Sequence, residues 1–512
     1  MLVKTYGSAL AGIDAIVVTV EVSITRGVSF LMVGLPDNVV RESQQRIATA
    51  IENIGFRMPG RRIVINMAPA GIRKEGAAYD LTLAVGILAA SGQIPAGMLG
   101  DFLIMGELSL DGSLLPVKGA LPIAVTAARK GFRGFILPEQ NAPEAALVGS
   151  LEVYGVSRLG EVADFFSGKV ALKRVRVDAE QEFSRCADIH GEDFSDVCGQ
   201  ENVKRALEIA ASGGHNVLMI GSAGSGKTML ARRLPTILPP FTLGESLETT
   251  KIHSVAGRTG NRHSLMTRRP FRSPHSSISA VAMAGGGSLP QPGEVSLSHN
   301  GVLFLDELPE FQRTVLEVLR QPLEDRVIEI SRTRYSVRYP AGFMLVGSMN
   351  PCPCGNYNHP DKECVCPPGT VRKYLNRISG PLLDRIDIHI EVVPVPFDKL
   401  DRQGSAESSV PVRARVTKAR KVQQDRFAGY PSVHCNAQMN TKMIREFCTI
   451  SDAGKLLLKN AMVRLGLSAR AFDRILKLSR TIADLEGCRS VQPEHLAEAI
   501  QYRSLDRETW AG

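Results

Sequence analysis

The sequence lacks any long apolar run, since none reaches the roughly 18 residues that a membrane-spanning helix needs. Its first 22 residues are interrupted by Asp14 and Glu21 and have no small-residue cleavage site, which argues against a signal peptide. Cysteine is also scarce, and nine in 512 residues without a secretory signal argue against a disulfide framework. We therefore expect a cytoplasmic protein with no membrane partner.

Aromatic residues are few, at 5%, but 44% hydrophobic and 22% charged residues are ordinary for a globular protein. The net charge of +9 permits binding to a polyanion. Residues 251–275 concentrate this charge, with six lysines and arginines and no acidic residue. This run is a candidate for contact with nucleic acid, although a solvated basic face has the same composition.

Composition divides the chain into four parts. Residues 1–168 alternate β-rich runs with one apolar helix-like run, and residues 169–192 form a charged, weakly periodic linker. Over residues 193–395 strands alternate with helices, which is typical of a parallel α/β sheet, and residues 396–512 are mainly helical. The expected fold class is α/β, with an α+β domain, a parallel-sheet domain and a helical C-terminal part.

A phosphate-binding pattern, G-x-x-x-x-G-K-[ST], lies between the strand-like run NVLMI and a helix-like segment. Its glycines let backbone N–H groups converge on phosphates, and the helix N-terminus adds a favourable dipole. We expect Lys227 to reach the β- and γ-phosphates of ATP and Thr228 to hold Mg²⁺. The expected nucleotide-binding residues are Gly221, Ser222, Ala223, Gly224, Ser225, Gly226, Lys227 and Thr228.

Polar residues follow two later strand-like runs. The run VLFL is followed directly by Asp306 and Glu307. Asp306 suits Mg²⁺ and nucleotide binding, and Glu307 is placed to polarise the attacking water. The run GFMLVGSM ends at Asn350, whose amide can orient the same water. Strands also end in asparagine simply because it forms turns.

Four cysteines, Cys352, Cys354, Cys364 and Cys366, form two C-x-C pairs in the loop 351–369. Four thiolates supply a tetrahedral site for structural Zn²⁺, although the spacing differs from the commoner C-x₂₋₄-C patterns. Reduced thiols or a redox pair are the alternatives, and His359 is a spare ligand.

Residues 325–343, DRVIEISRTRYSVRYPAGF, have the alternation of a β-hairpin. Arg332 and Arg334 lie near its expected tip, where repeated subunits could present a cationic ring to a DNA backbone. A hairpin with a merely soluble basic turn has the same pattern.

From Phe194 to the C-terminus the sequence resembles an AAA+ ATPase of the magnesium-chelatase-like group, and the whole chain is similar to the ComM/YifB family. The strings that carry the resemblance are GSAGSGKT, RRPFRSPHSSIS, GGGSLPQPGEVSLSHNGVLFLDELPEF, GSMNPCPCG and SGPLLDRIDIHIEV.

The resemblance implies roles for three more residues. Asn350 corresponds to the sensor 1 residue, Arg385 to the arginine finger that reaches the γ-phosphate of a neighbouring subunit, and Arg470 to the sensor 2 arginine of the helical lid. Arg377 is a nearby alternative for the finger. A finger supplied in trans implies a homo-oligomer, which in this family is expected to be a hexamer.

Residues 1–168 resemble the ribosomal S5 domain 2-like fold of the Lon protease domain, on the strings RKEGAAYDLTLAVGILAASGQIP and MGELSLDGSLLPVKGALPIAVTAARKGFRGFILPE. By this resemblance Ala78 occupies the place of the reactive serine of Lon, and the partnering lysine of Lon falls near Leu121, so no peptidase activity is expected. Lys74 and Lys118 lie nearby but do not align with that lysine.

The function that the resemblance implies is a Mg²⁺-dependent hexameric ATPase that moves single-stranded or branched DNA, as a branch-migration helicase in recombination and natural transformation. The alternatives are a protein-remodelling motor of magnesium-chelatase type and an unfoldase. Against the chelatase alternative we find no D-x-S-x-S metal motif, and we expect the Lon-like domain to be foreign to that subunit.

Overall fold

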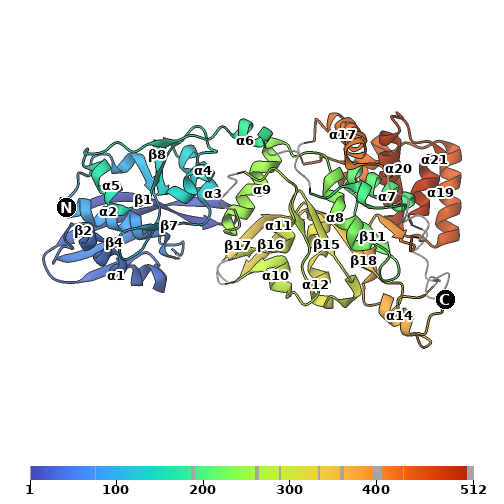
Figure 1. The fold of residues 1–512 in the computed structure, drawn as a ribbon, viewed down its shortest axis with the longest axis horizontal. Helices are drawn as coiled ribbons and strands as arrows, with labels where there is room; N and C mark the ends of the chain where they lie inside the picture. Colours follow the sequence, from blue (N-terminus) through green and yellow to red (C-terminus); the bar gives the residue numbers. More distant parts are fainter. Residues whose placement is uncertain are drawn as a thin grey trace. The chain divides into compact units, whose positions relative to one another are not determined.

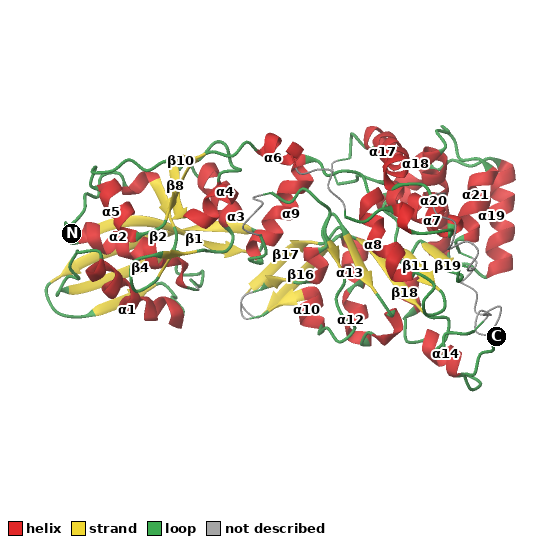
Figure 2. Ribbon diagram, viewed as in Figure 1, coloured by secondary structure: helices red, strands yellow, loops and turns green. Residues whose placement is uncertain are grey.

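The computed structural model describes residues 2–74, 76–185, 191–259, 265–287, 290–332, 335–357, 362–395, 406–430 and 432–503. Contacts divide the chain into two units (Figures 1 and 2). Unit 1 comprises Met1–Ala187, Leu243–Thr267 and Pro290–Pro292, and unit 2 comprises Asp188–Thr242, Arg268–Leu289 and Gly293–Gly512. Among the described helices none has the length and apolarity to cross a membrane.

Unit 1 is built on an eight-stranded mixed sheet with the order β10-β9-β8-β5-β1-β2-β4-β3. Val18, Val20 and Val22 alternate along β2 with more exposed residues, so one face of the strand enters the core. The strands are β1 (Leu2–Ala11), β2 (Asp14–Thr25), β3 (Phe30–Val33), β4 (Arg62–Ala68), β5 (Phe102–Ile104), β8 (Gly134–Pro138), β9 (Glu152–Val156) and β10 (Arg174–Val175), with β6 (Glu107–Leu108) and β7 (Leu114–Leu115) as a separate pair and β14 (Gln291–Pro292) as a short strand.

The helix predicted by the apolar run is α2 (Asp80–Ala90), and all of its residues are buried. Gly86 lets it pack closely on the sheet, because a Cβ there would lie 2.8 Å from a methyl carbon of Val22. The other helices of unit 1 are α1 (Asn38–Asn53), α3 (Ala120–Arg129), α4 (Ala142–Ala145), α5 (Leu159–Phe166), α6 (Ala179–Arg185) and α9 (Leu243–Val255).

Helix α9 belongs to unit 1 although it follows the phosphate-binding pattern in the sequence. Leu243 and Leu247 of this helix pack in an apolar cluster with Leu121, Leu147 and Leu265. The Leu121 side chain is 1% exposed. Leu121, near which the resemblance places the Lon lysine, is therefore part of an apolar contact with α9.

A buried carboxylate fixes the end of α9. Glu144 accepts hydrogen bonds from the hydroxyl groups of Ser254 and Thr259 and from the backbone N–H of Leu121, the last two at 3.0 and 2.9 Å. Burial raises the pKa of Glu144 above its ordinary value, while these three hydrogen bonds oppose the rise.

Unit 2 contains the parallel sheet that the sequence predicts. Its five strands have the order β12-β15-β18-β11-β19, and every neighbouring pair is parallel. The strands are β11 (Val217–Ile220), β12 (Phe271–Arg272), β15 (Val302–Leu305), β18 (Met344–Met349) and β19 (Ile388–Glu391), and the short strand β13 (Gly285–Gly286) lies outside the sheet.

The C-terminal helices share one apolar core with this sheet. Val416, Ile475 and Leu496 of these helices belong to the same cluster as Val217 and Phe304 of the strands. These C-terminal helices gather at the side of the sheet formed by β11 and the terminal strand β19 (Figures 1 and 2). The helices of unit 2 are α7 (Glu201–Gly213), α8 (Lys227–Ile237), α10 (Ala280–Ala284), α11 (Glu294–Leu297), α12 (Arg313–Val318), α13 (Arg320–Asp325), α14 (Thr370–Leu375), α15 (Gly380–Leu383), α17 (Ser409–Arg426), α18 (Thr441–Phe447), α19 (Asp452–Leu465), α20 (Ala469–Leu485) and α21 (Pro493–Gln501).

The hairpin predicted at 325–343 is present as the antiparallel pair β16 (Val327–Arg332) and β17 (Tyr335–Pro340). Arg332 is the last residue of β16 and pairs in register with Tyr335. Its side chain, and the whole of Arg334, lie outside the described part of the chain. Their contact with DNA stays a prediction.

We predict that Glu144→Ala loosens α9, because it removes the shared acceptor of three donors, two of which, Leu121 and Ser254, are buried. Each buried donor without a partner costs about 1–3 kcal/mol. Hydrogen exchange should show faster exchange of the α9 amides and unchanged exchange in α2. In the wild-type protein, the raised pKa of Glu144 means that this region is most stable below the ordinary carboxyl pKa and loses stability as pH rises through the folded-state pKa.

Glu144→Gln, which stays neutral and keeps an acceptor oxygen, is the matched control. It should exchange more slowly than Glu144→Ala and should lose the pH dependence. Equal exchange in both variants would contradict the role assigned to this carboxylate.

Candidate nucleotide-binding site

The predicted nucleotide-binding residues meet at one edge of the unit 2 sheet. Because the five strands are parallel, their carboxyl ends lie together. The phosphate loop, residues 221–228, follows β11 at this edge. Asp306 and Glu307 follow β15, and Asn350 follows β18, which lies between β15 and β11.

The phosphate loop needs glycine for two different reasons. A Cβ at Gly221 would lie 2.2 Å from the carbonyl oxygen of Val392, so only glycine fits beside the residue that follows β19. Gly224 and Gly226 instead have φ angles of +78° and +94°, which side chains disfavour. The loop is thereby bent so that α8 begins at Lys227, with Gly226 as its N-cap residue.

The Lys227 side chain reaches back to the first residues of this loop. Its Nζ donates to the carbonyl oxygens of Gly221 and Ser222, both at 2.8 Å, and to Asn350 Oδ1 at 3.3 Å. Burial lowers the pKa of Lys227, and the nearby carboxylates Asp306 and Glu307 oppose this change. The three acceptors hold the ammonium group where the loop bends toward α8.

The expected Mg²⁺ ligands are in contact. The Thr228 hydroxyl donates to Asp306 Oδ2 at 2.8 Å, and the Ser348 hydroxyl donates to Asp306 Oδ1. A carboxylate and a hydroxyl side by side are ligands that Mg²⁺ uses beside phosphate oxygens. The sequence did not single out Ser348, because a polar residue inside a buried strand gives no motif.

Glu307 has a backbone conformation that favours glycine, with φ of +53°. Its N–H donates to Asp306 Oδ1 at 3.1 Å and to Ser348 Oγ at 3.3 Å, and these bonds hold the strained conformation. The side chain is exposed. Its carboxylate is therefore open to solvent beside the Asp306–Thr228 pair, as the base expected for water activation must be.

The loop offers unused hydrogen-bonding groups to a phosphate. Among the described residues, the buried hydroxyl oxygens of Ser222 and Ser225 have no hydrogen-bond partner. Buried hydroxyls normally have partners. Together with Lys227 and the N-terminus of α8, they fit a bound phosphate chain.

The three candidate arginines are divided between the two opposite edges of the sheet. Arg377 contacts Glu310 at 3.0 Å, just beyond Glu307, and so lies at the phosphate-loop edge of its own chain. Arg385 precedes β19, and its carbonyl oxygen accepts a hydrogen bond from Asn216, which precedes β11. Arg385 therefore lies at the amino edge, opposite the phosphate loop.

Arg470 lies at the same amino edge as Arg385. Its side chain is 64% exposed, and its guanidinium pairs with Asp384 at 3.5 Å. Arg385 pairs with Glu324 and donates to the Pro381 carbonyl oxygen at 2.7 Å. The four residues of β11 separate these arginines from the phosphate loop, a length of about 13 Å at the usual rise per residue of a strand.

A buried charge network fixes this amino edge. Asp387 pairs with Arg474 of α20 at 2.6 Å and with His215 at 3.2 Å, and the other ring nitrogen of His215 bonds to Thr481 at 2.8 Å. Burial opposes ionisation, but Arg474 and His215 hold the pKa of Asp387 below its ordinary value. The sequence did not reveal this network, because its members are scattered.

The basic run 251–275 is not one free surface. Arg269 donates to the carbonyl oxygens of Pro239 and Asn300 at 2.6 and 2.8 Å, and Arg272 pairs with Glu294 at 2.6 Å. These two arginines hold unit 2 together. The nucleic-acid contact suggested for the run therefore does not extend to them.

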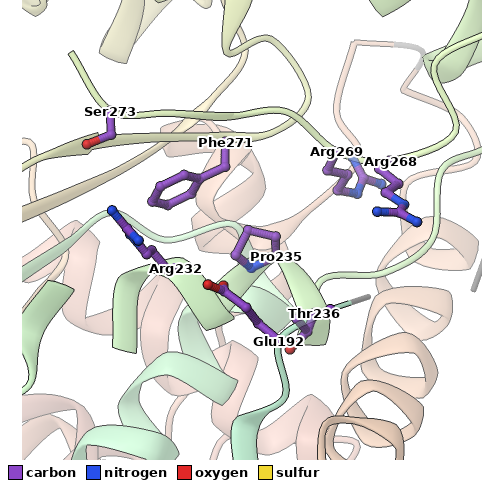
Figure 3. A pocket seen from close by; sticks show the side chains of 9 residues that line it. Glu192, Arg232, Pro235, Thr236, Arg268, Arg269, Phe271 and Ser273 are labelled. Carbon is purple, nitrogen blue, oxygen red and sulfur yellow. The ribbon is translucent and has the colours of Figure 1, made fainter. Parts of the chain in front are cut away.

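A cavity of about 390 Å³ adjoins this run but is not the nucleotide site. Figure 3 shows its lining, where Arg232 and Pro235 of α8 face Phe271. Phe271 begins β12, so the cavity lies toward the amino edge of the sheet. The lining residues are Gly191, Glu192, Arg232, Pro235, Thr236, Arg268, Arg269, Phe271 and Ser273.

The four clustered cysteines are close together. The ligand atoms of Cys352, Cys354, Cys364 and Cys366 all lie within 4.8 Å of one another, so this group could hold a metal ion. His359, the spare ligand considered from the sequence, lies outside the described residues.

Three family models match the chain. The model for magnesium chelatase subunit ChlI matches residues 193–400, and the model for its C-terminal part matches residues 406–503. A further model, described as subunit ChlI of Mg-chelatase, matches residues 20–141. This last match contradicts our expectation that the N-terminal domain is foreign to the chelatase subunit.

Several characterised and uncharacterised bacterial proteins are similar over the chain. Competence protein ComM of Haemophilus influenzae is 44% identical over 99% of this chain and 98% of its own length. YifB of Escherichia coli is 44% identical over 98% of this chain and 96% of its own length. The magnesium-chelatase 38 kDa subunit of Rhodobacter capsulatus is 26% identical over 31% of this chain and 50% of its own length. The protein therefore belongs to the ComM/YifB family of magnesium-chelatase-like AAA+ ATPases.

Proposed function

We propose that this protein is a Mg²⁺-dependent, homo-hexameric ATPase that moves DNA. Lys227 binds the β- and γ-phosphates, and Thr228 and Asp306 hold Mg²⁺, which when bound neutralises charge on the phosphate oxygens. Glu307 accepts a proton from the attacking water, and Asn350 orients that water. The contacts of Lys227 with Asn350 and of Thr228 with Asp306 support these roles, because they place both pairs at the phosphate loop.

The observation that carries the proposal is the separation of the two halves of the catalytic set. Lys227, Asp306 and Glu307 lie at the carboxyl edge of the sheet, whereas Arg385 and Arg470 lie at the amino edge of the same chain. Within one chain, these two arginines and the phosphate loop therefore lie at opposite edges of the sheet. A neighbouring chain supplies them, and a closed ring gives every site its arginines.

Hydrolysis in a ring can drive a polymer through its centre. We assign DNA as that polymer, because the net charge is +9 and the sequence has Arg332, the last residue of β16, and Arg334 between the two strands of the hairpin. The similarity to Competence protein ComM agrees with a role in competence. We assign the motor to recombination of incoming DNA, of the branch-migration type, in the cytoplasm.

The second candidate is a motor of magnesium-chelatase type that remodels a protein. The matches to chelatase family models at both ends of the chain favour it, and the absence of a D-x-S-x-S motif from the sequence speaks against it. An unfoldase is a third candidate, supported only by the AAA+ fold.

We predict opposite nucleotide-binding behaviour for two variants of the same pocket. Lys227→Ala should abolish ATP binding, since it removes the cation at the phosphates. Glu307→Gln should bind ATP normally, hydrolyse it at least about 10²-fold more slowly, and accumulate assembled rings. Equilibrium binding of a fluorescent ATP analogue and analytical ultracentrifugation measure both effects. Normal turnover by Glu307→Gln would remove this residue from the mechanism.

We predict that two inactive variants complement each other. Arg385→Ala should slow hydrolysis by about 10³-fold or more, as loss of an arginine finger does. In an equal mixture with Lys227→Ala, about a quarter of the interfaces combine an intact phosphate loop with an intact Arg385, if subunits mix at random and a finger acts in trans. ATPase activity should therefore return.

The mixture of Lys227→Ala with Glu307→Gln is the matched control, and it should stay inactive because both changes damage the same half-site. A mixture of Arg377→Ala with Lys227→Ala tests the alternative finger. Recovery with Arg377→Ala and none with Arg385→Ala would exchange the roles of the two arginines.

We predict that branched or single-stranded DNA stimulates ATP hydrolysis and that rising salt weakens the effect, because phosphate contacts release counterions. The assay compares forked, four-way and single-stranded DNA with an unfolded protein at equal mass. Arg332→Ala combined with Arg334→Ala should reduce stimulation and leave basal hydrolysis unchanged. Stimulation by the unfolded protein alone would favour the protein-remodelling candidates.

A further inference from the structure

The sulfur atoms of the cysteine cluster have the spacing of a metal site. The Sγ of Cys352 lies 3.3 Å from that of Cys354 and 3.7 Å from that of Cys364, and Cys354 and Cys364 are 3.6 Å apart. Four thiolates at the usual Zn–S distance of about 2.3 Å occupy the corners of a tetrahedron with edges of about 3.8 Å. A disulfide would require about 2.05 Å.

Backbone N–H groups point at these sulfur atoms. The N–H of Tyr357 donates to Cys352 Sγ at 3.3 Å, and those of Asn356 and Val365 donate to Cys354. Such bonds stabilise thiolates and orient metal ligands. The Cys352 side chain is fully buried, so a thiolate there depends on these donors and on a bound cation.

The other described cysteines have no such arrangement. Among the residues that the structure describes, only one further group has three or more metal-binding side chains together, and it contains a single cysteine, Cys488. Cys198, Cys435 and Cys448 are free and lie outside both groups. Among the described residues, clustering of cysteines is therefore confined to residues 352–366.

The cysteine loop adjoins the ATP site at two places. Cys352 is two residues from Asn350, whose Oδ1 accepts from Lys227 Nζ at 3.3 Å. Gly355 lies against the phosphate loop, because a Cβ added there would be 3.8 Å from the backbone nitrogen of Ala223. The Asn350 amide and the bend of the phosphate loop thus both border the cysteine loop.

We propose that Cys352, Cys354, Cys364 and Cys366 bind one Zn²⁺ as a closed structural site, and that the metal holds Asn350 and the phosphate loop in their ATP-binding arrangement. Four thiols each lose a proton to solvent when the ion binds, so Zn²⁺ forms four Zn–S bonds and the centre carries a net charge of −2. All four positions are filled by protein, which leaves no place for a catalytic water.

The inference deepens the proposed function, since it rests on ATP binding at residues 221–228, but it does not depend on DNA. Two sites that stabilise one arrangement affect each other reciprocally. Zinc should therefore tighten ATP binding, and ATP should slow the loss of zinc. A metal ion that stabilised the loop without this coupling would change the folding of the loop and leave ATP affinity unchanged.

The test uses the full chain purified without chelator. Elemental analysis should give one zinc per chain, and replacement by Co²⁺ should give the visible absorption of a tetrahedral thiolate complex. Removal of zinc with a chelator should weaken binding of a fluorescent ATP analogue by about 5–150-fold, the usual range for coupled sites, and added Zn²⁺ should restore it. Restoration of ATP binding in the same sample would show that the weaker binding did not come from misfolded protein.

Cys364→Ser should lose the metal and bind ATP weakly, whereas Cys198→Ser, a free cysteine outside the cluster, should match the wild-type protein in both measurements. A chain with four reactive thiols and no zinc, or with a disulfide between these cysteines, would overturn the metal site. Bound zinc whose removal leaves ATP affinity unchanged would overturn the coupling. Failure of DNA to stimulate hydrolysis would refute the DNA motor alone, because neither readout here involves DNA.

Discussion

The two edges of a parallel β-sheet impose the main constraint on this protein. Strands β11 and β19 run in the same direction, so the phosphate loop follows β11 at one edge while Arg385 precedes β19 at the other. No side chain of ordinary length reaches through the sheet from one edge to the other. Within one chain Arg385 therefore lies at the edge opposite the phosphate loop, and for this reason the proposed ATP site takes that arginine from a neighbouring chain.

The amino edge is held by a buried charge and not by apolar packing alone. Asp387 is almost fully buried, Arg474 compensates its charge, and His215, whose pKa is lowered by burial, lies within hydrogen-bond distance of it. Removing one partner of such a pair leaves an uncompensated buried charge, which is far more costly than an exposed ion pair. Because Arg474 lies on α20 and Asp387 adjoins the strand after Arg385, the network links the position of the helical lid to that of the proposed finger.

Unit 1 has an apolar core of its own. Its core is complete, with α2 buried on all sides against the sheet. Leu121 of α3 packs against α9. Helix α9 comes from the stretch that follows the phosphate-loop helix, so a segment of the ATPase sequence completes the N-terminal unit.

Local patterns in the sequence determined the phosphate loop, the strand that ends in Asp306, the hairpin and the cysteine pairs, because each depends on residues that are neighbours in the chain. The parallel sheet was also predictable, since strands and helices alternate with regular spacing. Tertiary structure alone decided the strand order, the edge on which Arg377, Arg385 and Arg470 lie, and the docking of α9. It also assembled His215, Asp387 and Arg474, which are separated by up to 259 positions. These features depend on contacts between distant residues, and burial of a charge or placement at a sheet edge leaves no local pattern to read.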